Sequence, residues 1–265
     1  MTLEIHVSPP APGTEAGHPP LVFVHGAFAG AWCWQEFFTP FFSRQGYPTV
    51  AFSLRGHGGS DGRVGLDLAS LSDFVADLRS VLDTLDRPAV LIGHSMGGMV
   101  VQKYLEEGEA AGLVLMASVG PWGLIESSWH MMVANPGLAA GIAMAQSLGK
   151  TFLNPAVLYH GLFATPVPAH RAEAYFQRFQ PESQRVILDM SWLDVPRRPP
   201  ASPVPALVMG AELDTFIPAS MVRRTARWLD AEEIIVPGMA HAMMLEETWR
   251  DAAEPILDWL RETGL

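Results

Sequence analysis

The chain has 265 residues, of which 49% are hydrophobic, and its formal net charge at pH 7 is −11. This composition excludes a disordered polymer, and the negative charge argues against a nucleic-acid partner, because phosphate backbones would be repelled. No run of about 18 apolar residues occurs, and residues 1–6 lack the basic and apolar regions of a signal peptide, so we expect no membrane span and a cytoplasmic protein.

Apolar runs typical of buried strands alternate with helical patterns along most of the chain. In chain order, the expected strands are Leu3–Val7, Leu21–Val24, Thr49–Leu54, Ala89–Gly93, Leu113–Ala117, Ala206–Gly210 and Glu233–Val236. The expected helices are Ala31–Arg44, Leu71–Leu85, Met96–Glu107, Ala219–Leu229 and Glu246–Arg261. Strands without polar alternation that are separated by helices predict an α/β fold, in which a mostly parallel central sheet carries helices on both faces.

Residues 120–202 interrupt this alternation. They contain no convincing strand, and several helical stretches are broken by prolines before the Pro-rich end at residues 196–203. Six Lys and Arg against five Asp and Glu give this segment a net charge of +1, which leaves −12 for the remainder. We therefore predict a core made of residues 1–119 and 203–265, with residues 120–202 inserted as a helical cap, or lid.

Residues 90–101 read V-L-I-G-H-S-M-G-G-M-V-V, with a serine between glycines. A strand is expected to end at Gly93 and a helix to begin at Met96, so Ser95 would occupy a sharp turn at the carboxyl edge of the sheet. The helix N-terminus favours negative charge at the same point. A helix-capping role is the alternative, but this context favours a nucleophile. The side chain of His94 is expected to point away from Ser95.

A serine nucleophile needs a base, and the base needs an acid that orients it. His241 follows the last expected strand, and Asp214 follows the strand before it, so both loops should open at the edge that carries Ser95. We predict Ser95, Asp214 and His241 as a catalytic triad. Glu212 is a second candidate for the acid.

Two backbone N–H groups are candidates for an oxyanion hole. One belongs to Met96, directly after the nucleophile, and the other to Ala27, in the tight His25-Gly26-Ala27-Phe28 loop after the strand that ends at residue 24. Gly26 permits a close backbone approach. His25 is expected to fix the loop by hydrogen bonds rather than to act as a catalyst.

These motifs, in this order, resemble the α/β-hydrolase superfamily. The matching stretches cover the predicted core and are His25–Phe28, Arg55–Ser60, Gly93–Gly98, Gly210–Asp214 with Pro218, and Gly238–His241. The resemblance implies Ser95 as nucleophile, Asp214 and His241 as its partners, and Met96 and Ala27 as oxyanion donors. It also implies a mainly structural role for the Arg-Gly-His-Gly turn, so His57 receives no catalytic role.

The stretch H-G-A-x-x-G-A-W-x-W, from His25 to Trp34, looks like a loop of plant methyl-ester esterases and hydroxynitrile lyases, and it occurs in many bacterial esterases. Hydroxynitrile lyase chemistry needs an additional positive group in the pocket. Lys150 is the only lysine of residues 120–202, and nothing in the sequence places it there.

The predicted function is that of a serine carboxylesterase, which cleaves small to medium apolar acyl or aromatic esters through an acyl-enzyme. No metal or organic cofactor is predicted, and the expected partner is a small-molecule ester. The sequence does not predict an oligomeric state. Phe28 and four large residues of the cap are expected to line an adaptable apolar pocket; the four are Trp129, Met132, Met144 and Trp192.

Three alternatives stay open. A C–C bond hydrolase would use the same triad. A thioesterase would need a docking site for phosphopantetheine, for which Arg171, Arg178 and Arg185 are candidates if they are more than a solvated surface. A non-catalytic ligand receptor on the same scaffold is the third. The single cysteine, Cys33, is read as a buried apolar residue, with a nucleophile as its less favoured role.

Overall fold

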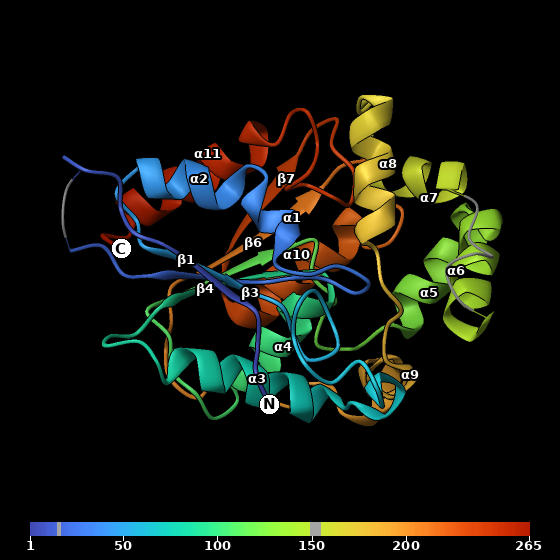
Figure 1. The fold of residues 1–265 in the computed structure, drawn as a ribbon, viewed down its shortest axis with the longest axis horizontal. Coiled ribbons are helices and arrows are strands. Elements are labelled where there is room, and N and C mark those ends of the chain that lie inside the picture. The colour runs from blue at the N-terminus through green and yellow to red at the C-terminus, as the bar shows by residue number, and fades with distance from the viewer. Residues whose placement is uncertain (15–16, 149–154) are drawn as a thin grey trace.

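The computed structural model describes residues 1–14, 17–148 and 155–265. Its centre is a seven-stranded sheet with the strand order β1-β3-β2-β4-β5-β6-β7, in which only β1 runs antiparallel to its neighbour (Figure 1). The strands are β1 (Ile5–Ser8), β2 (Leu21–Val24), β3 (Thr49–Phe52), β4 (Val90–His94), β5 (Gly112–Met116), β6 (Ala206–Ala211) and β7 (Glu232–Val236). The predicted mostly parallel sheet is confirmed.

Helices cover both faces of the sheet because its central strands are apolar on both sides. Along β2, Leu21 and Phe23 contribute to one buried cluster and Val22 and Val24 to the other. The first cluster includes residues of α1 (Trp32–Gln35), α2 (Phe38–Arg44) and α11 (Arg250–Glu262). The second includes residues of α3 (Leu71–Leu82), α4 (Met96–Tyr104) and α10 (Ala219–Leu229), and a short 3₁₀ turn, η1 (Leu66–Leu68), precedes α3.

Two expected helices differ from the structure. The aromatic-rich stretch 31–44 forms α1 and α2 rather than one helix, because the backbone of Phe37 leaves the helical region with φ −133°. The last helix begins at Arg250 rather than at Glu246, since residues 246–249 form turns. Glu246 therefore lies in a loop, where its carboxylate is free to bind backbone N–H groups.

Residues 120–202, called the cap segment below, connect β5 to β6. The described part of the segment contains no strand. Its helices are α5 (Ile125–Ala134), α6 (Pro136–Leu148), α7 (Pro155–Leu162), α8 (Ala169–Arg178) and α9 (Gln184–Leu188), followed by a π-helical turn, η3 (Asp189–Leu193). Prolines mark the starts of α6, α7 and α8, as their fixed φ allows.

Figure 1 shows α5 to α8 gathered at one side of the molecule, on the right of that view. The division of the chain into a core and a separate cap unit stays a prediction. None of the helices that the structure describes is both long and apolar enough to cross a membrane.

Candidate active site

Ser95 occupies the turn between β4 and α4. Its backbone angles are φ 52° and ψ −117°, a strained conformation for a residue with a side chain. Close packing holds this turn in place: a Cβ on Gly97 would lie 2.3 Å from the carbonyl oxygen of Val24. Only glycine at position 97 lets α4 start so close to the end of β2, and this brings Ser95 next to the Gly26–Ala27 loop.

Three side chains from distant parts of the sequence form one hydrogen-bonded chain. Asp214 Oδ2 lies 2.8 Å from His241 Nδ1, and His241 Nε2 lies 3.1 Å from Ser95 Oγ. Because a carboxylate only accepts, Nδ1 carries the proton, and the lone pair of Nε2 faces the serine hydroxyl. Asp214 is also fixed by the N–H groups of Phe216 and Ile217, which donate to Oδ1 at 2.7 and 2.9 Å. The structure thus brings together the three residues that the sequence singled out.

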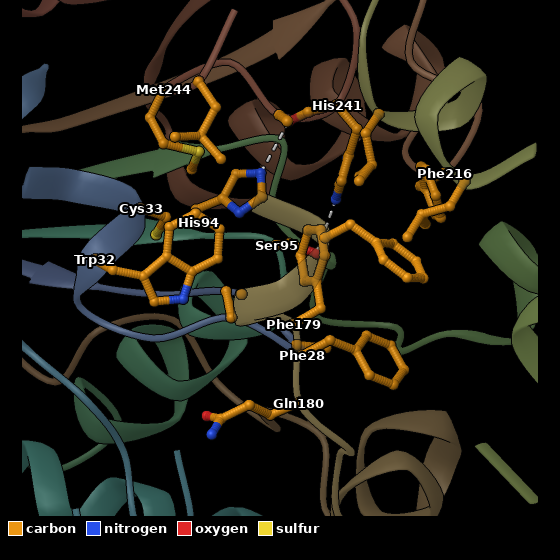
Figure 2. A pocket seen from close by; sticks show the side chains of 18 of the residues that line it. Phe28, Trp32, Cys33, His94, Ser95, Phe179, Gln180, Phe216, His241 and Met244 are labelled. Carbon is orange, nitrogen blue, oxygen red and sulfur yellow. Dashed lines mark hydrogen bonds between the residues drawn. The ribbon is translucent and has the colours of Figure 1, made fainter. Parts of the chain in front are cut away.

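The imidazole of His241 is held between two other rings (Figure 2). The ring of Phe216 lies 4.6 Å from it and that of His94 lies 4.8 Å from it, measured between centroids. His94 Nε2 donates to the backbone oxygen of His241 at 2.9 Å. His94 therefore packs against the triad rather than pointing away, which corrects the expectation. Burial, followed by the nearby His241, lowers the pKa of His94 well below its ordinary value, so this residue stays neutral.

The two predicted oxyanion donors belong to the two backbone segments that meet at Ser95. Met96 is the first residue of α4, and Ala27 lies on the wall of the cavity that contains Ser95. A Cβ on Gly26 would lie 2.8 Å from His94 Nδ1 and 3.1 Å from the Cβ of Ser95, so glycine is needed for this approach. The backbone at Gly26 thus lies close to Ser95, and the roles of Met96 and Ala27 as oxyanion donors stay a prediction.

His25 fixes the loop from the core side. Its Nδ1 donates to the oxygen of Gly26 at 2.8 Å, and its Nε2 accepts from the N–H of Leu54 at 3.0 Å. These partners define a neutral imidazole. Burial is the main cause that lowers the pKa of His25 to about 3, and His57 adds to the shift. The predicted role of His25, that of fixing the loop, agrees with these contacts.

Ser95 and His241 open into an apolar cavity. It has about 1000 Å³ of space between atoms, part of which opens to solvent. Its walls come from the Gly26–Cys33 stretch, the loop after α8, and the loops that hold Phe216 and His241. The cap segment contributes Ile142, Leu158, Leu162, Phe176, Phe179, Gln180 and Pro181. Such a cavity suits an apolar group attached to a carbonyl next to Ser95.

Comparisons with known proteins agree with this geometry. A sequence profile described as the alpha/beta hydrolase family matches residues 21–254. The chain belongs to the alpha/beta hydrolase family. A monoacylglycerol lipase of Mycolicibacterium smegmatis is 26% identical over 239 residues, which are 83% of this chain and 80% of that protein. Methylesterase 9 of Arabidopsis thaliana is 39% identical over 80 residues, 29% of this chain and 30% of that protein's length.

Solved structures show the same fold. An esterase from Thermogutta terrifontis matches this α/β-hydrolase with a TM-score of 0.70 at 20% identity, over 98% of this chain and 93% of that one. An esterase from Exiguobacterium antarcticum matches with a TM-score of 0.73 at 18% identity, over 98% and 96% of the two chains. The predicted fold and family of this hydrolase are confirmed.

Of the five predicted pocket residues, Phe28 lines the cavity of the hydrolase and the other four do not. Trp129 is 66% exposed, Met132 54%, Met144 44% and Trp192 62%, so their side chains lie on the outer surface of the cap segment. A cap helix has an inner and an outer face, and both are apolar in α5 and α6, so the sequence pattern did not separate them. The cap residues that do line the cavity come mostly from α7, α8 and the loop after α8.

The structure also bears on two of three further residues that the sequence analysis considered for other roles. Cys33 is 2% exposed, and burial raises the pKa of its thiol, so a nucleophilic role is not supported. Glu212 is exposed and accepts from the N–H of Gly238 at 2.9 Å, away from His241. Lys150 lies outside the described residues.

The three arginines of the cap segment do not form a common site. Arg171 pairs with Glu36 and Glu247, and the guanidinium of Arg178 lies 5.7 Å from the ring centroid of Trp32. Arg185 donates to Asp189 at 2.7 Å within its own helical turn. Because each arginine has its own partner in this chain, they give no support to a shared docking site for a phosphate.

Proposed function

We propose that this α/β-hydrolase is a carboxylesterase that cleaves small to medium apolar acyl or aromatic esters through an acyl-enzyme. The observation that carries the proposal is the hydrogen-bonded chain Asp214–His241–Ser95, which opens into an apolar cavity. Esterases and a lipase among the relatives support the same reaction class.

Acylation begins when Ser95 Oγ attacks the acyl carbon and its proton passes to His241 Nε2. The carbonyl oxygen becomes an oxyanion, which accepts from the N–H groups of Met96 and Ala27. Losing one such donor raises a barrier of this kind by about 2.7–4 kcal/mol. The tetrahedral intermediate then collapses: the bond to the alcohol oxygen breaks, and His241 gives its proton to the leaving alcohol.

Deacylation repeats these steps with water. His241 Nε2 takes a proton from water, whose oxygen attacks the acyl carbon, and the bond to Ser95 breaks as His241 returns the proton to Oγ. Asp214 accepts from His241 Nδ1 and stabilises the imidazolium that forms in both half-reactions. The products are the free acid and the alcohol.

The cavity wall supports the proposed substrate class. Phe28, Phe176, Phe179 and Phe216 surround the space in front of Ser95, and no Lys, Arg, Asp or Glu side chain is part of the described lining. A charged acyl group would lose its hydration there without gaining an ionic partner. The separated cap arginines likewise favour simple esters over coenzyme A thioesters.

Comparison of matched substrates tests the proposal. We expect the purified protein to hydrolyse p-nitrophenyl butyrate and octanoate, with Ser95→Ala at the background rate. We expect a kcat/KM for octanoyl-coenzyme A at least about tenfold below that for the octanoate ester, since nothing in the cavity binds the phosphates. A preference for the thioester would contradict the proposed carboxylesterase function and favour a thioesterase. A preference for a dienoate with a C–C bond to cleave would favour a C–C bond hydrolase.

A further inference from the structure

The cap segment holds the loop that carries Ala27. Phe28, which follows Ala27, donates its N–H to Glu182 Oε2 at 3.2 Å, and its carbonyl oxygen accepts from the N–H of Gln180 at 2.9 Å. Both backbone polar groups of Phe28 are therefore bound by the loop between α8 and α9. These two hydrogen bonds link the cap segment directly to the stretch that carries the proposed oxyanion donor.

Phe28 needs these contacts because its backbone is strained. Its φ is 65°, a left-handed value that a residue with a large side chain rarely adopts. Such a conformation persists where the surroundings fix it. The conformation of Phe28 in turn sets the direction of the chain at Ala27, whose N–H is the proposed second oxyanion donor. Contacts to Phe28 thus bear directly on the oxyanion hole.

Glu182 is a buried carboxylate with several donors around it. Its side chain is 0% exposed, and Oε2 lies 3.1 Å from Nε2 of His57, whose side chain is also 0% exposed. The backbone N–H of Ser183 donates to Oε1 at 2.8 Å. His57 Nδ1 donates to the oxygen of Arg55 at 3.0 Å, which leaves Nε2 facing the carboxylate. Burial alone would raise the pKa of Glu182, but His57 and the N–H of Ser183 hold that pKa below its ordinary value.

Gln180 joins the same two parts of the core. Its Oε1 accepts from the N–H of Gly58 at 2.6 Å, while its own N–H binds Phe28. The two cap residues therefore bind both the oxyanion loop and the His57–Gly58 turn. That turn was expected to be mainly structural, and these contacts give it a more specific role: it places the proton donor that faces Glu182.

We propose that Glu182 is a positioning residue, which holds the Ala27–Phe28 loop in the geometry that the oxyanion hole requires and so couples the seating of the cap to catalysis. This inference rests on the proposed esterase function and extends it to a residue that never touches the substrate. Its side chain acts through the N–H of Phe28, with His57 as the counter-charge that allows a carboxylate to be buried there.

Glu182→Gln is the sharpest variant because it keeps the shape of the side chain while it removes one acceptor oxygen and the charge that faces His57. The carboxylate of Glu182 has two oxygens, which face the N–H groups of Phe28 and Ser183 and Nε2 of His57, whereas an amide has one oxygen. If the oxygen of the new amide faces Phe28, its NH₂ group meets the N–H of Ser183; in the other orientation the NH₂ group meets the N–H of Phe28. At least one buried N–H group is left without an acceptor in either orientation, so we expect the loop to shift.

The test measures the hydrolysis of an octanoate ester together with the inhibition by a matched pair of ketones. Ser95 Oγ attacks the carbonyl carbon of an alkyl trifluoromethyl ketone, and its proton passes to His241. The carbonyl oxygen of the ketone then becomes the anionic oxygen of a hemiketal, which is bound in the oxyanion hole. The methyl ketone of the same chain length stays a ketone and reports binding in the cavity alone. Together they separate the oxyanion hole from the acyl site.

We expect Glu182→Gln to lower kcat by about 10- to 100-fold with little change in KM. Inhibition by the trifluoromethyl ketone should weaken by a similar factor, whereas inhibition by the methyl ketone should not change. Glu106→Gln is the matched control. Glu106 is 8% exposed, pairs with Lys103 at 2.8 Å and accepts from the N–H of Arg197 in the cap segment, but lies outside the cavity. It should lose stability without losing kcat.

Glu182→Asp covers the case in which the amide variant fails to fold, because it keeps the charge beside His57 but shortens the arm that reaches Phe28. It should show the same selective loss for the trifluoromethyl ketone. Wild-type kcat in a folded Glu182 variant, or equal weakening of both ketones, would overturn the inference. A wild-type protein that neither hydrolyses esters nor binds the trifluoromethyl ketone would instead refute the proposed function.

Discussion

At the scale of single residues, the backbone around Asp214 decides which way its carboxylate points. The N–H groups of Phe216 and Ile217 both donate to Oδ1, so Oδ2 is the oxygen that faces His241. In Asp214→Asn, the amide oxygen is the group that those two N–H groups select, and the NH₂ group then faces His241 Nδ1. The proton of the imidazole moves to Nε2, which can no longer accept from Ser95.

We expect Asp214→Asn to lower kcat by about 10⁴-fold with the fold intact, because the base is present in the wrong tautomer. Glu212→Gln is the control, since Glu212 binds the N–H of Gly238 on the surface. Steady-state hydrolysis and a circular dichroism spectrum of each variant check this. Equal activity of the two variants would show that Asp214 does not orient the base.

Spacing in the sequence predicted the triad because each residue follows a strand of a parallel sheet, and these strands end at one edge. The contact of His94 with His241 was missed because a backbone carbonyl gives no sequence signal. Glu182 was missed for the same reason: its main partners are the N–H of Phe28 and a histidine 125 positions away. Contacts to backbone groups across a cap cannot be read from local pattern.

At the scale of elements, we expect α7 and α8 to set the length of the proposed acyl site. A second hollow lies beside the first in the cap segment, lined by these two helices and the turns next to them. Four apolar residues, Leu158, Leu162, Phe176 and Phe179, line both spaces and so form the wall between them. Removal of a large side chain from this wall should extend the space in front of Ser95.

We expect Phe176→Ala to raise the kcat/KM ratio of laurate to butyrate esters by about tenfold or more, because the longer chain gains apolar surface to bury. Trp192→Ala is the matched control: its side chain is 62% exposed, and it should leave the ratio unchanged. A series of p-nitrophenyl esters measures both. An unchanged profile in Phe176→Ala would place the acyl chain elsewhere.

The periodicity of the cap helices predicted that they exist but not which face is inward. A helix of the sheet core is apolar on one side, so its buried face can be predicted, as in α3 with Leu71, Phe74 and Leu78. Helices α5 and α6 are apolar around most of their circumference. For that reason Trp129, Met132 and Met144 were placed in the pocket, while the structure puts them on the surface.

At the scale of the whole molecule, buried neutral histidines make the folded state sensitive to acid. The pKa of His25 is lowered to about 3, mainly by burial, whereas an unfolded histidine titrates near about 6.5. Between these values the unfolded chain binds a proton that the folded chain does not. Stability from this group is therefore fully present above about pH 6.5 and is lost as the pH falls toward 3. His94, whose pKa is also lowered, acts in the same direction.

We expect wild-type protein to lose about 2 kcal/mol more unfolding free energy than His25→Asn between pH 7 and pH 5, because asparagine does not titrate. Urea unfolding at both pH values measures the difference. The variant itself should be less stable at pH 7, since Leu54 loses its acceptor. A constant gap between the two proteins at both pH values would mean that His25 is not held neutral in the fold.

The central claim is that Ser95, activated by His241, is the nucleophile of an accessible active site. Labelling with a fluorophosphonate, followed by mass spectrometry of the digested protein, tests it most directly. We predict a single adduct on Ser95 in the wild-type protein, slower labelling in His241→Ala, and no adduct in Ser95→Ala. An adduct on another residue, or a wild-type protein that stays unlabelled while it hydrolyses esters, would contradict the account.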